Sequence, residues 1–386
     1  MKLKKIIALS ITACLIISAG VILAIKLRHR EIPPTPTPGG LYVEQSAKMS
    51  WNELTEKVIE IKDDKIVSIN NDEVGNICPD DTTFELVIPE TAGIKEIGMD
   101  AFNECMKLTS VTIPSTVLKI GTDAFYNCDN LTTVNIDGEN LTTIGYGAFT
   151  YCENLERIII PSSVTTIEQS AFIGCSKLDD VIIPAGVSVI ESHVFKDCIN
   201  LENVNIVGSI SEIEPYAFYN CVKLSSINNI IKDATSIGDS AFARCDGITS
   251  IEFGSVLTNI EKEAFLDCQM LQTVTFLSES VDFGIGVFNN CINLTSITLP
   301  INTSKINDYL FYNCEDLESI EISSNITEIG IRAFFNCFKL TPTFINVNWK
   351  YSSSKDSTEF TDIVLDDVNM KKLVDELADN YFKLNN

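Results

Sequence analysis

The stretch that decides the fold is residues 97–114, which read IGMDAFNECMKLTSVTIP. Its phenylalanine recurs eleven times, at intervals of 23 residues except for two of 24: Phe102, Phe125, Phe149, Phe172, Phe195, Phe218, Phe242, Phe265, Phe288, Phe311 and Phe334. A cysteine follows each of them by three residues. Self-similarity at a period of 20 to 29 residues is typical of a solenoid, in which each copy packs only against its neighbours.

The second half of each copy predicts a short β-strand. In residues 108–113 apolar and polar side chains alternate, so Val111 and Ile113 face inward and the residues between them face outward. Pro114 ends the strand, because proline has no N–H to donate. Stacked copies therefore predict one parallel sheet along the array.

The first half of each copy, Ala-Phe-x-x-Cys, has the i, i+1, i+4 spacing of a short helical turn. Asparagine often precedes the cysteine, as at Asn127 and Asn220, and suits a left-handed cap. We therefore predict an α/β repeat solenoid of about eleven 23-residue turns, with a parallel sheet on one face and short helical turns on the other.

These motifs resemble the BspA-like, Treponema pallidum-type leucine-rich repeats over residues 84–345. The resemblance implies a curved parallel-sheet solenoid, found in bacterial and protist surface proteins that are associated with adhesion rather than catalysis. Two departures are local: Asn229 occupies a normally apolar strand position, and Thr343 replaces an inward valine. We expect a bulge at residues 227–231 and a fraying final strand.

The N-terminal residues 1–30 predict a membrane anchor or signal segment. Lys2, Lys4 and Lys5 precede an apolar run, residues 6–25, which is long enough to span a roughly 30 Å hydrocarbon layer as a helix. A cleaved signal peptide and a lipobox at Cys14 are alternatives. Flanking positive charges nearly balance. The Pro/Thr/Gly linker at 31–40 that follows favours an extracellular repeat domain on a single-pass anchor.

Flanking regions at 41–83 and 346–386 predict caps for the exposed ends of the array. At the front, Ser50 and Glu53 form a capping box that opens a helix, followed by a strand at 65–69. At the back, helical spacing predicts an amphipathic helix formed by Met370, Leu373, Val374, Leu377, Tyr381 and Leu384.

Composition excludes several functions. The net charge of −25 opposes binding to nucleic acid. With only His29 and His193, a histidine-based catalytic triad or metal site has few placements. The cysteine column is expected to be free and buried, with disulfide rungs and metal binding as alternatives. We therefore predict no catalytic residues, metal or cofactor, and no enzyme.

The outward side chains of the strands predict the binding surface, because the core does not need them. Two isoleucines, Ile159 and Ile182, interrupt a polar column beside Arg157 and Asp180. An exposed apolar pair with charges beside it is typical of an interaction hot spot. The candidate binding residues are Arg157, Ile159, Asp180, Ile182, Asn135 and Asn205.

The sequence thus predicts a membrane-anchored cell-surface adhesion module. Its partners would be proteins or cell-surface macromolecules, a host matrix protein among them, bound through the exposed strand face. The alternative is a non-adhesive scaffold or envelope-organising protein that assembles with its own copies. A glycan ligand is a variant of the adhesion prediction. It is disfavoured because Trp51 and Trp349 lie outside the repeats.

Overall fold

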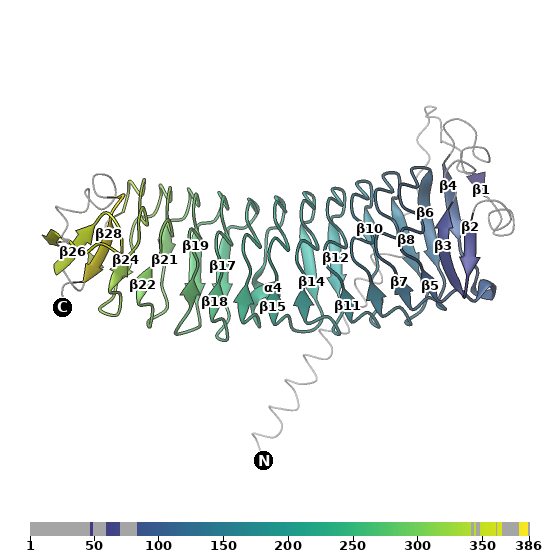
Figure 1. Cartoon of the computed structure of the whole chain (residues 1–386), viewed down its shortest axis with the longest axis horizontal. Helices are drawn as coiled ribbons and strands as arrows, with labels where there is room; N and C mark the ends of the chain where they lie inside the picture. Colours follow the sequence, from purple (N-terminus) through teal and green to yellow (C-terminus); the bar gives the residue numbers. More distant parts are fainter. Residues whose placement is uncertain are drawn as a thin grey trace, which may run out of the picture. The chain divides into compact units, whose positions relative to one another are not determined.

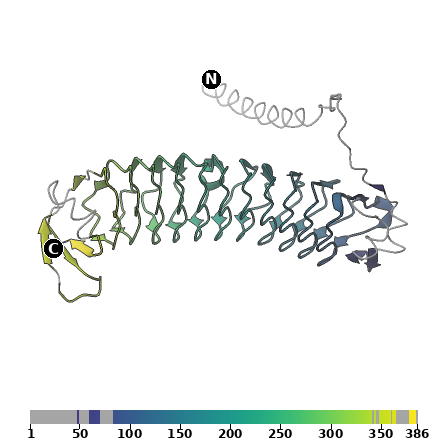
Figure 2. The same ribbon diagram turned by 90° about the horizontal axis from the view of Figure 1, so that it is seen from above.

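The computed structural model describes residues 47–48, 59–69, 83–340, 343–344, 348–359, 361–364 and 378–384. Residues Gln45–Asn386 form one compact unit. Residues 1–44, which include the predicted anchor and linker, lie outside the described residues. Within Gln45–Asn386 the chain coils repeatedly, and successive turns stack side by side along one axis (Figures 1 and 2). No helix in the described ranges is both long and apolar enough to cross a membrane.

One side of each turn carries the predicted strand, and we call this side the long-strand face. Its strands are parallel and offset by one copy, so Val111 pairs with Val134 and Ile113 with Ile136. The predicted parallel pairing is confirmed, but the strands of this face form four separate sheets rather than one. The strands are β1 (Ala47–Lys48), β4 (Phe84–Val87), β6 (Leu108–Ile113), β8 (Thr133–Ile136), β10 (Arg157–Ile158), β12 (Asp180–Ile183), β14 (Asn203–Ile206), β17 (Ser250–Phe253), β19 (Thr273–Phe276), β21 (Ser296–Ile297), β23 (Glu321–Ile322) and β25 (Thr343–Phe344).

A second set of strands, the short-strand face, was not predicted. In the repeats each of these strands has two residues and ends five residues before the phenylalanine. Two residues are too few to show the alternation that identifies a strand in a sequence. Gly121 follows one of them because a Cβ atom there would lie 2.8 Å from Ile97 O of the preceding turn. The strands are β3 (Lys65–Ile69), β5 (Glu96–Ile97), β7 (Lys119–Ile120), β9 (Thr143–Ile144), β11 (Thr166–Ile167), β13 (Val189–Ile190), β15 (Glu212–Ile213), β16 (Ser236–Ile237), β18 (Asn259–Ile260), β20 (Asp282–Phe283), β22 (Lys305–Ile306) and β24 (Glu328–Ile329).

The remaining side, the turn face, corrects the predicted helical turns. In the first copy Asp100 and Glu104 have φ of 54° and 56°, and every copy has left-handed residues two before and two after its phenylalanine. Left-handed residues do not continue a right-handed helix. Phe102 N instead donates to Ala124 O in the next copy, at 2.7 Å. The repeat is therefore a β-solenoid rather than an α/β solenoid.

The described residues contain two short helices, η1 (Glu90–Ala92) and α4 (Asn228–Ile231). The second lies where we predicted a bulge, so that prediction is wrong in form although the place is right. The extra residue of this 24-residue copy is accommodated by a single helical turn. Asn229 Nδ2 donates to Val204 O at 2.8 Å, and Asn228 Oδ1 accepts from Glu252 N at 3.1 Å. These two amides connect the helix to the neighbouring strands.

The core is a continuous column of phenylalanine rings. All eleven repeat phenylalanines are buried, and each ring stacks on the next with centroids 5.1 to 5.9 Å apart. Burial of apolar surface along this column is the main favourable contribution to folding. Because each ring between the two ends contacts the ring before it and the ring after it, the column couples the copies to one another.

The N-terminal end is closed by a hairpin. Strand β2 (Ile59–Lys62) pairs antiparallel with β3 (Lys65–Ile69), and β3 continues the short-strand face by pairing with β5. The predicted strand at 65–69 is confirmed. Lys65 Nζ contacts Glu96 Oε1 at 2.7 Å. The predicted helix that opens at Ser50 lies outside the described residues.

The C-terminal end is closed by three antiparallel strands: β26 (Asn348–Ser352), β27 (Thr361–Val364) and β28 (Tyr381–Leu384). Strand β28 pairs with β24, the last short strand, and Ala378 O accepts from Arg332 N at 2.6 Å. Tyr381 and Leu384 were predicted on a helix and lie instead on a strand. The rest of that predicted helix falls outside the described residues.

The last copy differs from its prediction in register. Thr343 pairs with Glu321, an outward position, and Phe344 pairs with Ile322, an inward one. The segment between Phe334 and β25 is therefore one residue shorter than in the preceding copy, so Thr343 takes an outward position and does not replace an inward valine. Strand β25 retains two paired residues where we expected fraying.

Candidate functional site

The outward side chains of the long-strand face form two columns across the solenoid. The column that includes Ile159 and Ile182 begins at Val87, and the strand register aligns Val87 with Thr112 and Thr112 with Asn135. Most members are polar. Ile159 is 65% exposed although it is apolar, whereas Ile182 is half-buried.

The strand ladder is interrupted at the candidate patch. Strand β10 is the last member of one sheet and β12 the first of the next; the short-strand face is likewise interrupted between β11 and β13. We call this place, where the ladders of both faces stop, the first interruption; between β14 and β17, at α4, only the long-strand ladder stops. Arg157 and Ile159 lie on one side of it, and Asp180 and Ile182 on the other. The turn face continues across it, since Phe149 N donates to Ala171 O at 2.8 Å.

The structure brings some of the six predicted residues together. Ile182 is the ladder partner of Asn205, and Asn205 Nδ2 lies 3.5 Å from Asp180 Oδ1. Arg157 pairs with Thr133 in the neighbouring strand. Asn135 is exposed in the same outward column on β8, one strand from the interruption, and the register of β8 with β10, continued by one residue, places it next to Ile159. Asp180, Ile182 and Asn205 therefore form the closest group.

A second interruption was not predicted from the sequence. It separates β20 and β21 from β22 and β23, where the long-strand face retains only an isolated bridge between Ser296 and Ser319. A pocket of about 420 Å³ opens there. Its lining residues are Ser296, Ile297, Thr298, Leu299, Pro300, Ile301, Ser319, Ile320, Glu321, Ser323 and Ile326.

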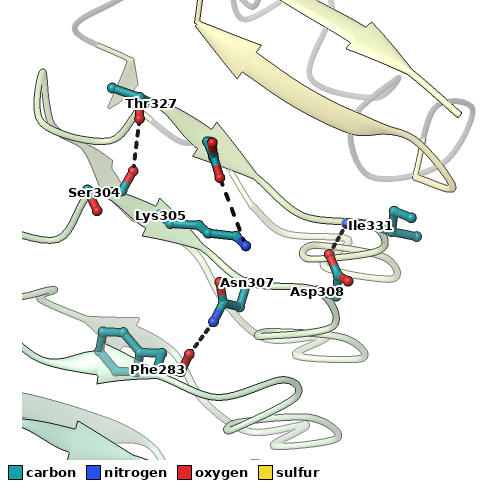
Figure 3. Close-up of polar contacts among 8 residues, drawn as sticks. Phe283, Ser304, Lys305, Asn307, Asp308, Thr327 and Ile331 are labelled. Carbon is teal, nitrogen blue, oxygen red and sulfur yellow. Dashed lines mark hydrogen bonds and ion pairs between the residues drawn. The ribbon is translucent and has the colours of Figure 1, made fainter. Parts of the chain in front are cut away.

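An asparagine marks this second interruption on the short-strand face. Asn307 stands where many copies have glycine, and its side-chain Nδ2 donates to Phe283 O (Figure 3). In the next copy the backbone makes this contact, since Gly330 N donates to Ile306 O at 2.7 Å. A side-chain amide thus joins the two turns where a backbone N–H does so elsewhere. The signal in the sequence is one Asn in a Gly/Glu column.

The cysteine column has a structural role that the sequence did not reveal. All eleven cysteines are free and buried, as expected. From Cys128 onward each Sγ donates to the backbone carbonyl of the phenylalanine in the preceding copy, as Cys128 does to Phe102 O, at 3.0 to 3.3 Å. Burial raises the pKa of these thiols, to about 12 at Cys337. A buried neutral thiol is a weak nucleophile and a weak metal ligand.

The turn face gathers aromatic side chains that the sequence analysis did not consider. His193 stacks on Tyr216 with centroids 5.0 Å apart, and Lys196 Nζ lies 5.6 Å from the centre of the Tyr219 ring. Burial and the nearby Lys196 lower the pKa of His193. Among the described residues no group of three or more His, Cys, Asp or Glu side chains is placed to hold a metal ion.

Comparison with known proteins gives the family. Residues 95–225, 165–291 and 258–386 match the BspA type leucine rich repeat region. A leucine rich cell surface protein from Faecalibacterium prausnitzii A2-165 is 25% identical, with a TM-score of 0.50 over 75% of this chain and 93% of that one.

A leucine-rich repeat protein from Bacteroides ovatus is 23% identical, with a TM-score of 0.53 over 74% of this chain and 86% of its own, and shows the fold. No curated protein matches the chain. The matching family is defined by a repeat and not by a catalytic site. The stacked phenylalanines, the buried cysteines and the family match from residue 95 to residue 386 together show that this chain belongs to the BspA type leucine-rich repeat family.

Proposed function

We propose that this chain is a membrane-anchored cell-surface protein that binds macromolecular partners through its long-strand face, at the patch formed by Asn135, Arg157, Ile159, Asp180, Ile182 and Asn205. The observation that carries the proposal is Ile159, which is 65% exposed in a mainly polar column. An apolar side chain in that position contributes nothing to the core, whereas a partner that covers it gains the free energy of its burial.

The first interruption supports the same patch. A continuous ladder holds neighbouring strands at about 4.8 Å. At the first interruption β10 and β12 belong to different ladders, so the outward side chains on these two strands are not held at that spacing by strand pairing. Asp180 and Asn205 supply polar groups beside Ile182, and this arrangement of an apolar centre with a polar edge is typical of protein interfaces.

The anchor and the location are part of the proposal. The apolar run at residues 6–25 would hold the chain in a membrane, and the proline-rich linker at 31–40 would separate it from the repeats. A relative named as a cell surface protein supports an outward-facing solenoid. A net charge of −25 favours partners with basic surfaces.

The test is a double variant, Ile159→Glu with Ile182→Glu. The matched control, Thr112→Glu with Thr275→Glu, adds the same charge in the same outward column. Binding of the full-length chain to immobilised matrix proteins is measured for both variants. We expect the patch variant to lose binding at least tenfold and the control to lose less than twofold.

Two outcomes would contradict the proposal. Equal binding by the two variants, with both folded by circular dichroism, would remove the patch from the interface. If matrix proteins are not bound and sedimentation shows the chain associating with itself through Ile159 and Ile182, the surface serves assembly, and the scaffold alternative replaces adhesion.

A further inference from the structure

We propose that the pocket at the second interruption binds a lysine or arginine side chain of a partner protein. This inference rests on the proposed function, because it adds a second contact on the same long-strand face. The pocket lies between β21 and β23, toward the C-terminal end of the solenoid and away from the patch around Ile159.

The floor of the pocket is apolar. Ile297, Ile320 and Ile326 are 5%, 3% and 1% exposed and line it from the core side. Ile301 also lines the pocket and is 66% exposed, which makes it the most exposed large apolar side chain among the described residues. An aliphatic chain in contact with these isoleucines would remove apolar surface from water.

The rim is polar and carries one sign of charge. Hydroxyl groups come from Ser296, Thr298, Ser319 and Ser323, and Glu321 is the one charged residue among those that line the pocket. Glu321 is exposed at an outward position of β23. Hydroxyl oxygens accept hydrogen bonds and a carboxylate accepts only, so the rim is complementary to a group rich in N–H donors.

A lysine or arginine side chain has both properties. Its methylene stem is apolar and its head is a cation with several donors, so the stem can lie on the isoleucines while the head reaches Glu321. An acidic side chain would face Glu321 with like charge, and a purely apolar one would leave the hydroxyls without a donor. The volume of about 420 Å³ lies within the ~300–1,000 Å³ range of small-ligand sites.

The experiment uses the full-length chain and small probes. N-acetyl-lysine methylamide and N-acetyl-arginine methylamide are titrated and followed by saturation-transfer NMR, with N-acetyl-norleucine methylamide as the uncharged probe. We expect saturation of the methylene protons of the two basic probes and at least fivefold weaker binding of the norleucine probe.

Two pairs of variants locate the site. Glu321→Gln should weaken the basic probes about fivefold, the effect of losing an exposed ion pair. Glu252→Gln should leave them unchanged, since it makes the same change of net charge in the same column, two strands before the pocket. Ser296→Arg places a competing basic side chain at the pocket and should abolish binding, whereas Ser250→Arg, in the same column, should not.

The inference is overturned if the norleucine probe binds as well as the lysine probe, or if Glu321→Gln and Glu252→Gln behave alike. Either result leaves the proposed function standing if Ile159→Glu with Ile182→Glu still abolishes binding to matrix proteins. Conversely, loss of the probes in Glu321→Gln with no effect of the isoleucine variants would keep the pocket and remove the patch.

Discussion

Replacement of Phe218 by alanine tests how the solenoid is held together. Phe218 is fully buried and stacks on Phe195 at 5.4 Å and on Phe242 at 5.2 Å. Truncation of a buried phenylalanine costs about 3–5 kcal/mol, through lost burial and the cavity left behind. Phe334, at the end of the column, has one ring neighbour in it, Phe311 at 5.6 Å.

The difference in unfolding free energy between Phe218→Ala and Phe334→Ala measures what ring stacking contributes to stability. An aromatic pair contributes about 0.5–1.5 kcal/mol beyond its buried area, so Phe218→Ala should destabilise the chain by about that much more than Phe334→Ala. Because copies contact only their neighbours, the central cavity also weakens the coupling between the two halves. Urea unfolding followed by circular dichroism should therefore become broader in Phe218→Ala, and a nearest-neighbour fit should place the loss at one interface.

A matched control is Tyr219→Ala, which truncates the half-buried neighbour on the turn face. It should shift the urea midpoint much less than Phe218→Ala does. Coupling of the copies through the ring column is refuted if Phe218→Ala and Tyr219→Ala are equally stable. It is also refuted if Phe218→Ala and Phe334→Ala unfold with the same urea midpoint and width.

Three further predictions concern thiols, pH and the C-terminal end. The eleven column cysteines should resist maleimide in the folded chain and react in urea, because all of them are buried and burial raises the pKa of thiols such as that of Cys221. Labelling counted by mass spectrometry checks this, and rapid native labelling of Cys221 would contradict it. Burial, followed by Glu214, Glu168 and Glu212, raises the pKa of Glu191 above its unfolded value, so the folded chain holds this proton more tightly. The contribution of Glu191 to the free energy of unfolding should therefore fall as pH rises from about 4.5 through the folded pKa. Glu191→Gln should flatten that part of the profile of urea midpoint against pH, and an unchanged profile would contradict the assignment. A chain ending at Leu377 lacks β28, so hydrogen exchange should accelerate at β24 and not at β6; uniform protection would show that β28 does not close the end.

The long-strand face could be predicted because the alternation of apolar and polar residues along it is sufficient to identify a strand. Inward apolar residues like Val111 and Ile113 repeat in most copies at the period of a strand, and burial on stacking fixes the register. The two-residue strands such as Lys119–Ile120 could not be predicted in the same way. They are held by contacts between turns, and those contacts leave little local pattern.

The turn face shows where a local pattern misleads. Asparagine before cysteine correctly indicated a left-handed residue, with φ of 62° at Asn220. The same backbone conformation is held by Glu104, Tyr151 and Arg244, which do not favour it. Hydrogen bonds to the next copy impose it, so the Ala-Phe-x-x-Cys spacing resembled a helical turn while the packing of neighbouring copies decided otherwise.

The binding surface could be predicted only in part. Exposure of Ile159 follows from its place in the alternation, and that expectation holds. The two interruptions depend on how far each turn lies from the next, and one sequence contains no direct measure of that spacing. The pocket beside Glu321 therefore became visible only in the structure, although Asn307 marks the same interruption on the short-strand face.

The proposal that the solenoid faces outward is tested most directly by protease digestion of cells that carry the full-length chain with an epitope after Asn386. The digestion is performed before and after removal of any cell wall. A cytoplasmic protein serves as the control for lysis. An outward-facing binding solenoid predicts loss of the epitope while the cytoplasmic control stays intact. An epitope that survives in wall-free cells and is digested only after lysis would place the solenoid inside the cell and contradict the proposal that it binds partners at the surface.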